Sequence, residues 1–308
     1  MAMPNENRAT LSGAMRVESA AVNVRAALRD AMARMRSADV PSHALAAELL
    51  LMHVLDCDRA WLYAHPEAPL DAEDARRYFE LVTRRAAGAP TQYLIGKQEF
   101  WGLEFEVTPA VLIPRPETEH LIEAALERLG ELRVRCPLRV ADVGTGSGCI
   151  AVALAHELSH SEIFATDISV RALEVARRNA ARHGMAGRIS FLECDLLDAL
   201  SNEANGFDLI VSNPPYVARN EEAQLQREVR EHEPHEALFC GPTGTEIYAP
   251  LIAQSAEMLR RGGFLVLEIG FGALDRVRPL FEESPAWTGI RVTNDLAGIP
   301  RVISAERA

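Results

Sequence analysis

One short segment combines an amide side chain, two prolines and an aromatic ring: Ser212-Asn213-Pro214-Pro215-Tyr216. Two successive prolines remove two backbone N–H donors and stiffen the chain, so that carbonyl oxygens remain as acceptors. The Asn213 side-chain oxygen and the Pro214 carbonyl can each accept one N–H, and the Tyr216 ring can stack on a flat group. The segment therefore suits a planar –NH2 group. It makes Asn213, Pro214 and Tyr216 candidate catalytic residues, and all four residues from Asn213 to Tyr216 candidates for substrate binding.

A second segment, Gly144-Thr145-Gly146-Ser147-Gly148, lies between two apolar runs. Glycine lets the backbone turn tightly and approach a ligand closely. The N-terminus of the helix expected next offers N–H groups that have no helical partner. The spacing G-x-G-x-G differs from the G-x-G-x-x-G of dinucleotide-binding proteins. The loop, with Asp142 before it, resembles the first motif of S-adenosylmethionine-dependent methyltransferases; the alternative is a tight strand-to-helix turn without a ligand.

Two acidic residues end later apolar runs. Asp167 comes 19 residues after Gly148, where an acid in such sheets accepts hydrogen bonds from ribose hydroxyls. The alternative for Asp167 is an N-cap for the helix that starts near Ser169. Asp195 follows the next run, where an acid reaches an adenine amino group or lies in a solvated loop.

The elements that would hold these residues alternate between strand and helix patterns. Strand-like runs are expected at Leu138–Val143, Glu162–Thr166, Arg188–Leu192, Phe207–Val211 and Gly263–Ile269, with two more at Gly289–Val292 and Arg301–Ser304. Such alternation predicts an α/β fold with a parallel sheet and helices on both faces. Ligands bind beyond the carboxyl ends of parallel strands, so we expect Asn213 to lie beside the cofactor of the glycine loop.

Four segments are predicted along the chain. Residues 1–17 are polar and aperiodic, and we expect a frayed N-terminus. Residues 18–90 carry apolar side chains at helical spacing and no strand pattern, which predicts a small helical domain. Residues 91–116 predict a β-hairpin linker, with strand-like runs on either side of Gly102. Residues 117–308 form the predicted α/β domain.

Composition excludes several classes of protein. Five scattered cysteines without a C-x-x-C pair indicate a reduced, cytoplasmic protein. No apolar run reaches the ~18 residues of a membrane span, and the N-terminus does not read as a secretory signal. The net charge is −12, and residues 91–308 carry 21 basic against 32 acidic side chains. That balance disfavours a nucleic-acid substrate, because phosphate neutralisation needs positive charge.

His156-Glu157-Leu158-Ser159-His160 matches the H-E-x-x-H pattern of zinc proteases. The helix expected from Ser147 ends near His160, and no third ligand can be assigned, so we expect no metal site here.

Four further segments carry a family resemblance: Val111–His120 (VLIPRPETEH), Glu233–Leu238 (EPHEAL), Gly241–Gly244 (GPTG) and Gly263–Gly270 (GFLVLEIG). Together with the Asn-Pro-Pro-Tyr segment and the helical N-terminal part, they resemble the release factor glutamine methyltransferase family over nearly the whole chain. The resemblance implies a class I, Rossmann-like S-adenosylmethionine-dependent methyltransferase fold. Its sheet would have seven mostly parallel strands, the last one antiparallel. An all-α domain that recognises the substrate would precede the sheet in the chain.

The resemblance also implies a reaction and a set of residue roles. A methyl group would pass from S-adenosylmethionine to the side-chain amide nitrogen of the glutamine in the Gly-Gly-Gln motif of class-1 peptide chain release factors. Residues 144–148 would line the cofactor, Asp167 would hold its ribose, and residues 213–216 would hold the substrate glutamine. Many relatives carry an aromatic residue where this chain has Leu196, beside the adenine, so a stacking contribution of ~0.5–1.5 kcal/mol would be absent. We expect a monomer.

Three alternatives remain open. A sister enzyme that methylates a glutamine of a ribosomal protein is the nearest, and the Pro-Arg-Pro-Glu-Thr-Glu stretch favours the release factor instead. An adenine-N6 methyltransferase would use the same Asn-Pro-Pro-Tyr chemistry, but the acidic charge disfavours it. A non-catalytic S-adenosylmethionine-binding partner of a translation factor would have no need of Asn213 and Tyr216.

Overall fold

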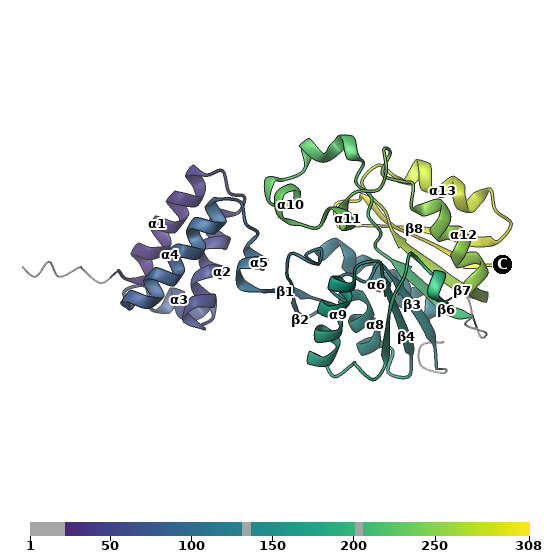
Figure 1. Ribbon diagram of the computed structural model, residues 1–308, viewed down its shortest axis with the longest axis horizontal. Helices are drawn as coiled ribbons and strands as arrows, with labels where there is room; N and C mark the ends of the chain where they lie inside the picture. The colour runs from purple at the N-terminus through teal and green to yellow at the C-terminus, as the bar shows by residue number, and fades with distance from the viewer. Residues whose placement is uncertain (1–21, 131–136, 201–205) are drawn as a thin grey trace, which may run out of the picture. The chain divides into compact units, whose positions relative to one another are not determined.

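The computed structural model describes residues 22–130, 137–200 and 206–308 (Figure 1). The chain divides into two compact units, Met1–Ala86 and Ala87–Ala308. The expected frayed segment 1–17 lies outside the described residues, as does Cys136. Within the described ranges, no helix is both long enough and apolar enough to cross a membrane.

The first unit is helical. Its helices are α1 (Val24–Ser37), α2 (His43–Leu55), α3 (Arg59–Ala64) and α4 (Ala72–Ala86). The Asn23 side chain caps α1 by accepting from the Ala26 N–H at 2.9 Å, which satisfies one of the donors that a helix start leaves free. Tyr78 of α4 is fully buried and donates to the Ala47 carbonyl of α2 at 3.1 Å, so its polar atom is satisfied inside the core.

The second unit contains a seven-stranded sheet in the order β5-β4-β3-β6-β7-β9-β8. Its strands are β3 (Arg139–Val143), β4 (Glu162–Asp167), β5 (Ile189–Glu193), β6 (Phe207–Ser212), β7 (Leu259–Glu268), β8 (Trp287–Asn294) and β9 (Pro300–Arg307). Strands β3 to β7 pair in parallel, and β9 pairs antiparallel with both β7 and β8. The predicted seven-stranded, mostly parallel sheet is confirmed, including the antiparallel last strand.

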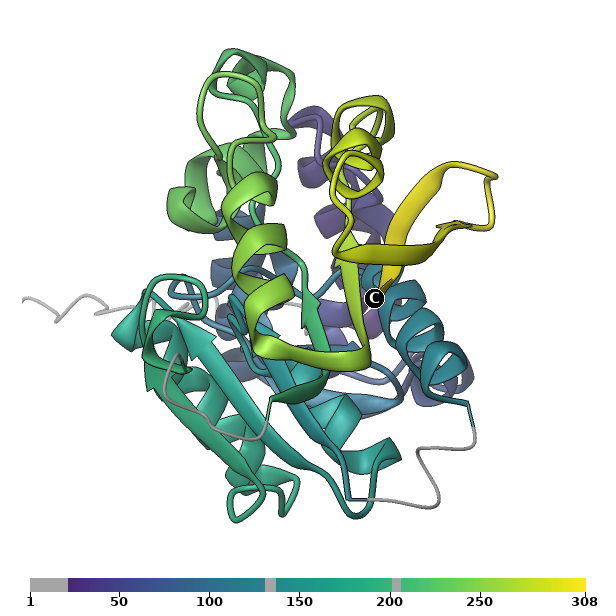
Figure 2. The ribbon, with the colours of Figure 1, turned by 90° about the vertical axis from the view of Figure 1, so that its right-hand side faces the viewer.

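Helices cover both faces of this sheet (Figures 1 and 2). The helices of the second unit are α5 (Thr91–Ile95), η1 (Pro116–Thr118), α6 (Glu119–Leu129), α8 (Cys149–Glu157), α9 (Val170–Arg182), η2 (Asp198–Leu200), η3 (Arg219–Gln224), α10 (Arg227–His232), α11 (His235–Leu238), α12 (Tyr248–Met258) and α13 (Leu274–Glu282), and those packed on the sheet are α6, α8, α9, α12 and α13. Alternate strand residues enter opposite cores: Val140 packs with α6 and α8, whereas its neighbour Ala141 packs with α12 and α13. This period of two explains why the strands read as continuous apolar runs.

A separate hairpin, β1 (Lys97–Phe100) and β2 (Leu103–Glu106), also belongs to the second unit. Its two turn residues, Trp101 and Gly102, have φ of 55° and 68°. Positive φ at both central positions matches the right-handed twist of hairpin strands. Phe100 and Phe105 bury their rings in the core shared with α6 and α8.

Candidate active site

The glycine loop joins the end of β3 to the start of α8. Gly144, Gly146 and Gly148 have φ of 72°, 55° and 81°, which side chains with a Cβ adopt only under strain. A Cβ on Gly148 would lie 3.0 Å from the Cβ of Ala176, so this glycine lets the loop pack on α9. A Cβ on Gly146 would meet no protein atom within 4 Å. The open side of Gly146 is therefore the face that a ligand can approach.

Asp142 supports this loop from below. Its Oδ2 accepts from the Thr145 hydroxyl at 2.6 Å and from the Ala151 N–H at 3.1 Å, which ties β3, the loop and α8 together. The carboxyl is completely buried, and burial raises its pKa to about 7.

Asp167, at the end of β4, holds the loop from the side. Its two oxygens accept from the Gly146 N–H at 2.9 Å and the Ser169 N–H at 2.8 Å. Burial raises its pKa, and the two N–H bonds oppose that shift. The cap of α9 is Ser169, whose hydroxyl accepts from the Ala172 N–H at 3.3 Å. Asp167 is therefore not the N-cap of α9, and its carboxylate lies beside the glycine loop.

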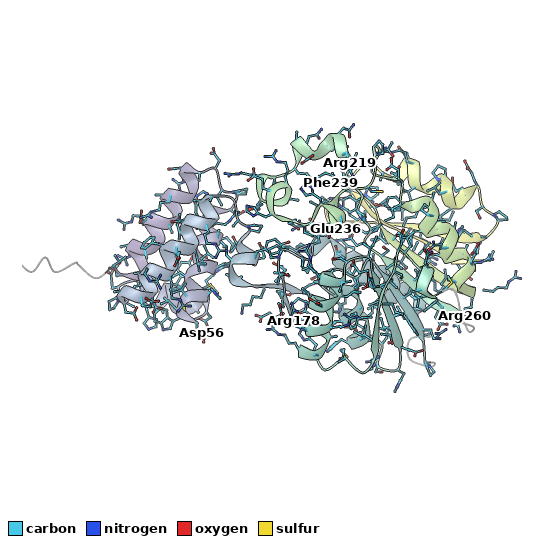
Figure 3. The ribbon with its side chains drawn as sticks, in the orientation of Figure 1. Asp56, Arg178, Arg219, Glu236, Phe239 and Arg260 are labelled. Carbon is cyan, nitrogen blue, oxygen red and sulfur yellow. The ribbon has the colours of Figure 1, made fainter. Side chains whose placement is uncertain are left out.

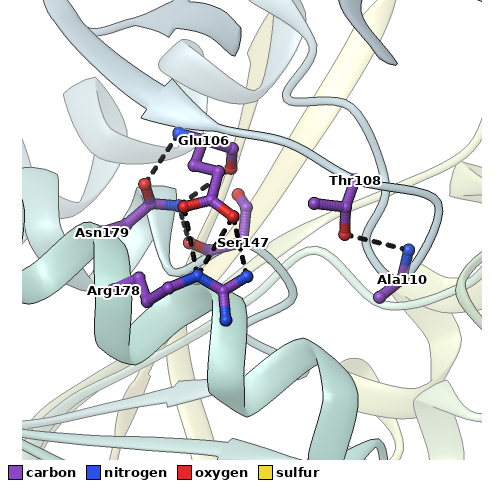
Figure 4. A network of polar contacts seen from close by, with 6 residues as sticks. All are labelled: Glu106, Thr108, Ala110, Ser147, Arg178 and Asn179. Carbon is purple, nitrogen blue, oxygen red and sulfur yellow. Dashed lines mark hydrogen bonds and ion pairs between the residues drawn. The ribbon is translucent and has the colours of Figure 1, made fainter. Parts of the chain in front are cut away.

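Asn179 links the glycine loop to the hairpin (Figure 4). Its Nδ2 donates to the Ser147 carbonyl at 2.8 Å and to the Glu106 carbonyl at 3.0 Å, and its Oδ1 accepts from the Glu106 N–H at 2.7 Å. The side chain is fully buried on the face of α9 that also carries Ala172, Val175 and Ala176. A polar residue on an apolar helix face was the sequence signal that could have identified it.

We expect Asn179→Ala to lower the free energy of unfolding by ~2–4 kcal/mol, because one buried and two partly buried backbone groups lose their partner. The matched control is Arg178→Ala on the same helix. Arg178 pairs with Glu106 at 2.7 Å but is half exposed, so its loss should cost ~1 kcal/mol or less. Urea unfolding of both variants measures the difference. Equal destabilisation by the two changes would contradict the role given to Asn179.

A cavity of about 370 Å³ lies at the carboxyl edge of the sheet. The sequence-predicted residues that line it are Gly144, Thr145, Gly146, Ser147, Asp167, Asp195, Leu196, Asn213, Pro214 and Pro215. Gly148 faces α9 instead, and Tyr216 lines a neighbouring cavity of about 620 Å³. Glu236 of α11 and Phe239, the residue after this helix, also line the first cavity. Figure 3 labels both residues.

Leu196 lies in this wall with an unusual backbone. Its φ of 47° is left-handed, and few residues other than Gly, Asn and Asp adopt that region. The Thr166 hydroxyl donates to the Leu196 carbonyl at 2.8 Å and holds the turn in place. The strand end at Thr166 thus fixes where the Leu196 side chain enters the cavity.

Asn213 follows β6 directly, where the two cavities meet. Its Nδ2 donates to the Thr118 hydroxyl at 3.1 Å. The preceding Ser212 donates its hydroxyl to the Val143 carbonyl at 2.7 Å, which pins the strand end to β3. With its nitrogen end engaged, the Asn213 amide presents its oxygen for a ligand donor, and the Pro214 carbonyl follows in the chain.

The Tyr216 ring packs against a glycine, Gly270. A Cβ on Gly270 would come within 2.9 Å of Tyr216 Cδ2, so only glycine leaves room for the ring. The Tyr216 hydroxyl donates to Glu268 Oε1 at 3.4 Å, and burial raises the pKa of the phenol, which stays protonated. Tyr216 therefore forms a wall of the second cavity.

Two segments that carried the family resemblance meet beside this cavity. Arg115 Nη2 lies 2.6 Å from Glu233 Oε1, and the Ile113 N–H donates to Glu233 Oε2 at 3.2 Å. The Glu233 side chain is 1% exposed, so the ion pair is screened little by water. It fixes the Pro-Arg-Pro-Glu-Thr segment against the loop after α10. The sequence analysis gave no role to Thr118 or Glu268. The signal for Glu268 was an acid at the end of an apolar strand.

The H-E-x-x-H pattern does not lie on one helix face. Helix α8 ends at Glu157, so His160 falls outside it. Glu157 instead accepts from the Trp101 indole N–H at 2.9 Å. In the part of the chain that the structure describes, no three His, Cys, Asp or Glu side chains are grouped to hold a metal ion.

A seven-stranded sheet in this order, with a glycine loop after β3 and an acid at the end of β4, defines a class I S-adenosylmethionine-dependent methyltransferase. Residues 124–233 match the family model described as "Methyltransferase small domain", and residues 26–96 match "PrmC N-terminal domain". The fold is also similar to a solved structure of the hMettl16 catalytic domain with an RNA hairpin. That similarity has a TM-score of 0.54, with 18% identity over 74% of this chain and 82% of that one.

Curated relatives extend the similarity over almost the entire chain. The release factor glutamine methyltransferase of Koribacter versatilis is 47% identical over 92% of this chain and 98% of its own. The protein of the same name from Nitratidesulfovibrio vulgaris is 43% identical over 91% of this chain and 94% of its own. The chain belongs to the release factor glutamine methyltransferase family.

Proposed function

We propose that the protein transfers a methyl group from S-adenosylmethionine to the side-chain amide nitrogen of the glutamine in the Gly-Gly-Gln motif of class-1 peptide chain release factors. The carrying observation is the Asn213 amide, whose nitrogen end donates to Thr118 and whose oxygen end accepts no hydrogen bond from the residues that the structure describes. It lies where a cavity with the glycine loop meets a second cavity. The names of the curated relatives support the same substrate.

The first cavity suits S-adenosylmethionine. The open face of Gly146 admits a ligand close to the backbone, and Asp167 offers a carboxylate at the loop's mouth for two ribose hydroxyls. Asp195 and Leu196 would lie at the adenine, with Thr145 and Ser147 completing the loop wall. The cofactor supplies a methyl group already activated on a sulfonium.

The second cavity suits a peptide that carries the amide. A glutamine amide nitrogen is a weak nucleophile because its lone pair is delocalised. Asn213 Oδ1 and the Pro214 carbonyl would accept its two N–H bonds and orient the nitrogen toward the first cavity, which supplies proximity. Positive charge would develop on the nitrogen as it bonds to the methyl carbon and the carbon–sulfur bond of the sulfonium breaks, and both acceptors would then bind its N–H groups more strongly. One of these N–H protons would afterwards pass to water, which leaves a neutral methylated amide. Pro215 and Tyr216 would confine the side chain between them.

The remaining proposals concern the domains, the oligomeric state and the location of the protein. Residues 18–90 would recognise the release factor, residues 91–116 would link that part to the catalytic residues 117–308, and the protein would act as a monomer in the cytoplasm. The acidic catalytic part disfavours a nucleic-acid substrate.

The assay compares substrates with one labelled cofactor. Purified class-1 release factor, ribosomal proteins and an adenine-rich oligonucleotide are each incubated with the protein and labelled S-adenosylmethionine. We expect label on the release factor at the highest kcat/KM. A higher kcat/KM for ribosomal protein or for the oligonucleotide would reject the proposal.

Leu196 offers a smaller, separate test of the cofactor site. We expect Leu196→Phe to tighten S-adenosylmethionine binding by ~2–10-fold, because an aromatic ring adds stacking on the adenine. Leu196→Met keeps an aliphatic side chain of similar size and serves as the control. Calorimetric titration gives both dissociation constants. Weaker binding by Leu196→Phe than by Leu196→Met would place the adenine elsewhere.

A further inference from the structure

Glu268 is the last residue of β7 and lines the second cavity. It is 1% exposed, and its Oε1 accepts from the Tyr216 hydroxyl at 3.4 Å. Its Oε2 has no hydrogen-bond partner among the residues that the structure describes. Buried polar atoms in proteins nearly always have a partner, so this oxygen is open to a donor from a molecule bound in the cavity.

The two arginines that line this cavity are paired with other acids. Arg115 Nη2 lies 2.6 Å from Glu233 Oε1, and Arg301 Nε lies 2.9 Å from Asp295 Oδ2. Within the described ranges, Glu268 forms no ion pair of its own. A buried carboxylate that lacks a cation depends on hydrogen-bond donors for its stability.

The surrounding strands hold the Glu268 carboxylate in one place. Its backbone pairs with Val302 of β9, and its carbonyl accepts from the Tyr248 hydroxyl at 3.1 Å. Gly270 leaves room for the Tyr216 ring, whose hydroxyl reaches Oε1. Because the carboxylate is already positioned, a ligand that binds it has little ordering cost to overcome.

Burial raises the pKa of the Glu268 carboxyl to about 7. A donor that reaches Oε2 would favour the ionised form and oppose this rise, since a hydrogen bond to a carboxylate stabilises its charge. An ionised carboxylate accepts hydrogen bonds and donates none. The missing partner is therefore an N–H or O–H group.

The proposed substrate carries such donors in its main chain. The two N–H groups of the glutamine side chain are assigned to Asn213 and Pro214, which leaves the backbone N–H groups of the Gly-Gly-Gln segment. Glycine has no Cβ, so its backbone can approach a cavity wall closely. The second cavity, at about 620 Å³, is larger than the first, at about 370 Å³, and has room for more than one side chain.

We propose that Glu268 is a substrate-binding residue whose Oε2 accepts a main-chain N–H of the peptide segment that carries the glutamine. The inference rests on the proposed function, because it adds a contact for that substrate at the same site. Glu268 would touch the peptide rather than the methyl group. Its loss is therefore expected to raise the KM for the peptide more than it lowers kcat.

The first test measures binding without methyl transfer. Glu268→Gln keeps a carbonyl oxygen for Tyr216 and places an NH2 group where Oε2 lay, so a donor would face a donor. We expect the Kd of a synthetic Gly-Gly-Gln peptide, titrated into the S-adenosylhomocysteine complex, to rise ~10–100-fold. The Kd of S-adenosylmethionine should stay within twofold of wild type.

The matched control is Glu257→Gln, at an exposed acid of α12 that lines neither cavity. It should leave both dissociation constants at wild-type values. An unchanged peptide Kd in Glu268→Gln would overturn the proposal.

Protein stability distinguishes a binding role from a structural one. A buried carboxylate oxygen without a partner destabilises the folded chain, so Glu268→Gln should unfold in urea at the wild-type midpoint or above it. A lower midpoint would show that the carboxylate supports the fold and would reject the binding role.

The second test needs no protein variant for its main comparison. A series of peptides replaces each main-chain N–H of the Gly-Gly-Gln segment, one at a time, by an ester oxygen. One ester should bind the wild-type protein ~10-fold more weakly than the parent peptide and bind Glu268→Gln as well as the parent does. Equal binding of all esters to the wild type, or the same loss in both proteins, would overturn the proposal.

The outcomes separate this inference from the proposed function. If the wild-type protein methylates no Gly-Gly-Gln substrate, the proposed function is rejected. If it methylates the peptide while neither Glu268→Gln nor any ester weakens binding, the function stands and the role of Glu268 is rejected.

Discussion

Replacing Asn213 by alanine is expected to lower kcat for methyl transfer by ~10²–10³-fold, the scale measured when one preorganised polar partner of a developing charge is removed. The lost oxygen is one of two acceptors proposed for the substrate amide. The Thr118 hydroxyl would also lose the hydrogen bond that it accepts from Asn213. Steady-state kinetics with labelled S-adenosylmethionine measure the loss, and titration calorimetry should show the cofactor Kd changed by only a few-fold.

The matched control is Asn294→Ala, which removes an exposed asparagine at the end of β8. It should leave kcat and cofactor binding at wild-type values. If Asn213→Ala instead weakened cofactor binding as strongly as it lowered kcat, Asn213 would be a cofactor ligand rather than the substrate acceptor.

The second large effect concerns the cofactor. We expect Asp167→Ala to raise the S-adenosylmethionine Kd by ~10–100-fold, because hydrogen bonds to a charged group contribute ~1.5–3 kcal/mol. The change also leaves the Gly146 and Ser169 N–H groups without their present acceptor, so the loop loses its lateral support. Calorimetric titration gives the Kd directly.

Two variants sharpen this result. Asp167→Asn keeps one carbonyl acceptor and should fall between wild type and Asp167→Ala. Asp195→Ala removes an acid from the same cavity that, among the described residues, makes no side-chain hydrogen bond to the glycine loop, and it should weaken binding less than Asp167→Ala. A larger effect at Asp195 would show that the two acids have exchanged the roles proposed for them.

The sequence predicted what local patterns determine. The runs that became β3, β4, β5, β6 and the second half of β7 carry mostly apolar side chains, and each of the three loop glycines has a positive φ. The position of Asp167 at the cavity was predictable because the carboxyl end of a parallel strand fixes where its side chain emerges. The position of Asn213 was predictable for the same reason, and the two prolines that follow it added a second signal.

The remaining parts of the site depend on contacts between distant segments. Thr118 and Asn213 are 95 residues apart, and only the folded sheet brings η1 beside the end of β6. Asn179 reaches Glu106 across 73 residues, and Arg115 reaches Glu233 across 118. Tyr216 was expected to stack on the substrate amide, and its contact with Gly270 depends on the packing of β7 beside β6. No local spacing specifies such pairs.

The most direct measurement of the central claim uses a class-1 release factor and its variant with the Gly-Gly-Gln glutamine changed to alanine. Each is incubated with the protein and labelled S-adenosylmethionine, and the modified peptide is located by mass spectrometry. The account predicts one added methyl group on the glutamine side chain of the first and none on the second. Equal labelling of both, or no labelling of either by a protein that binds the cofactor, would contradict it.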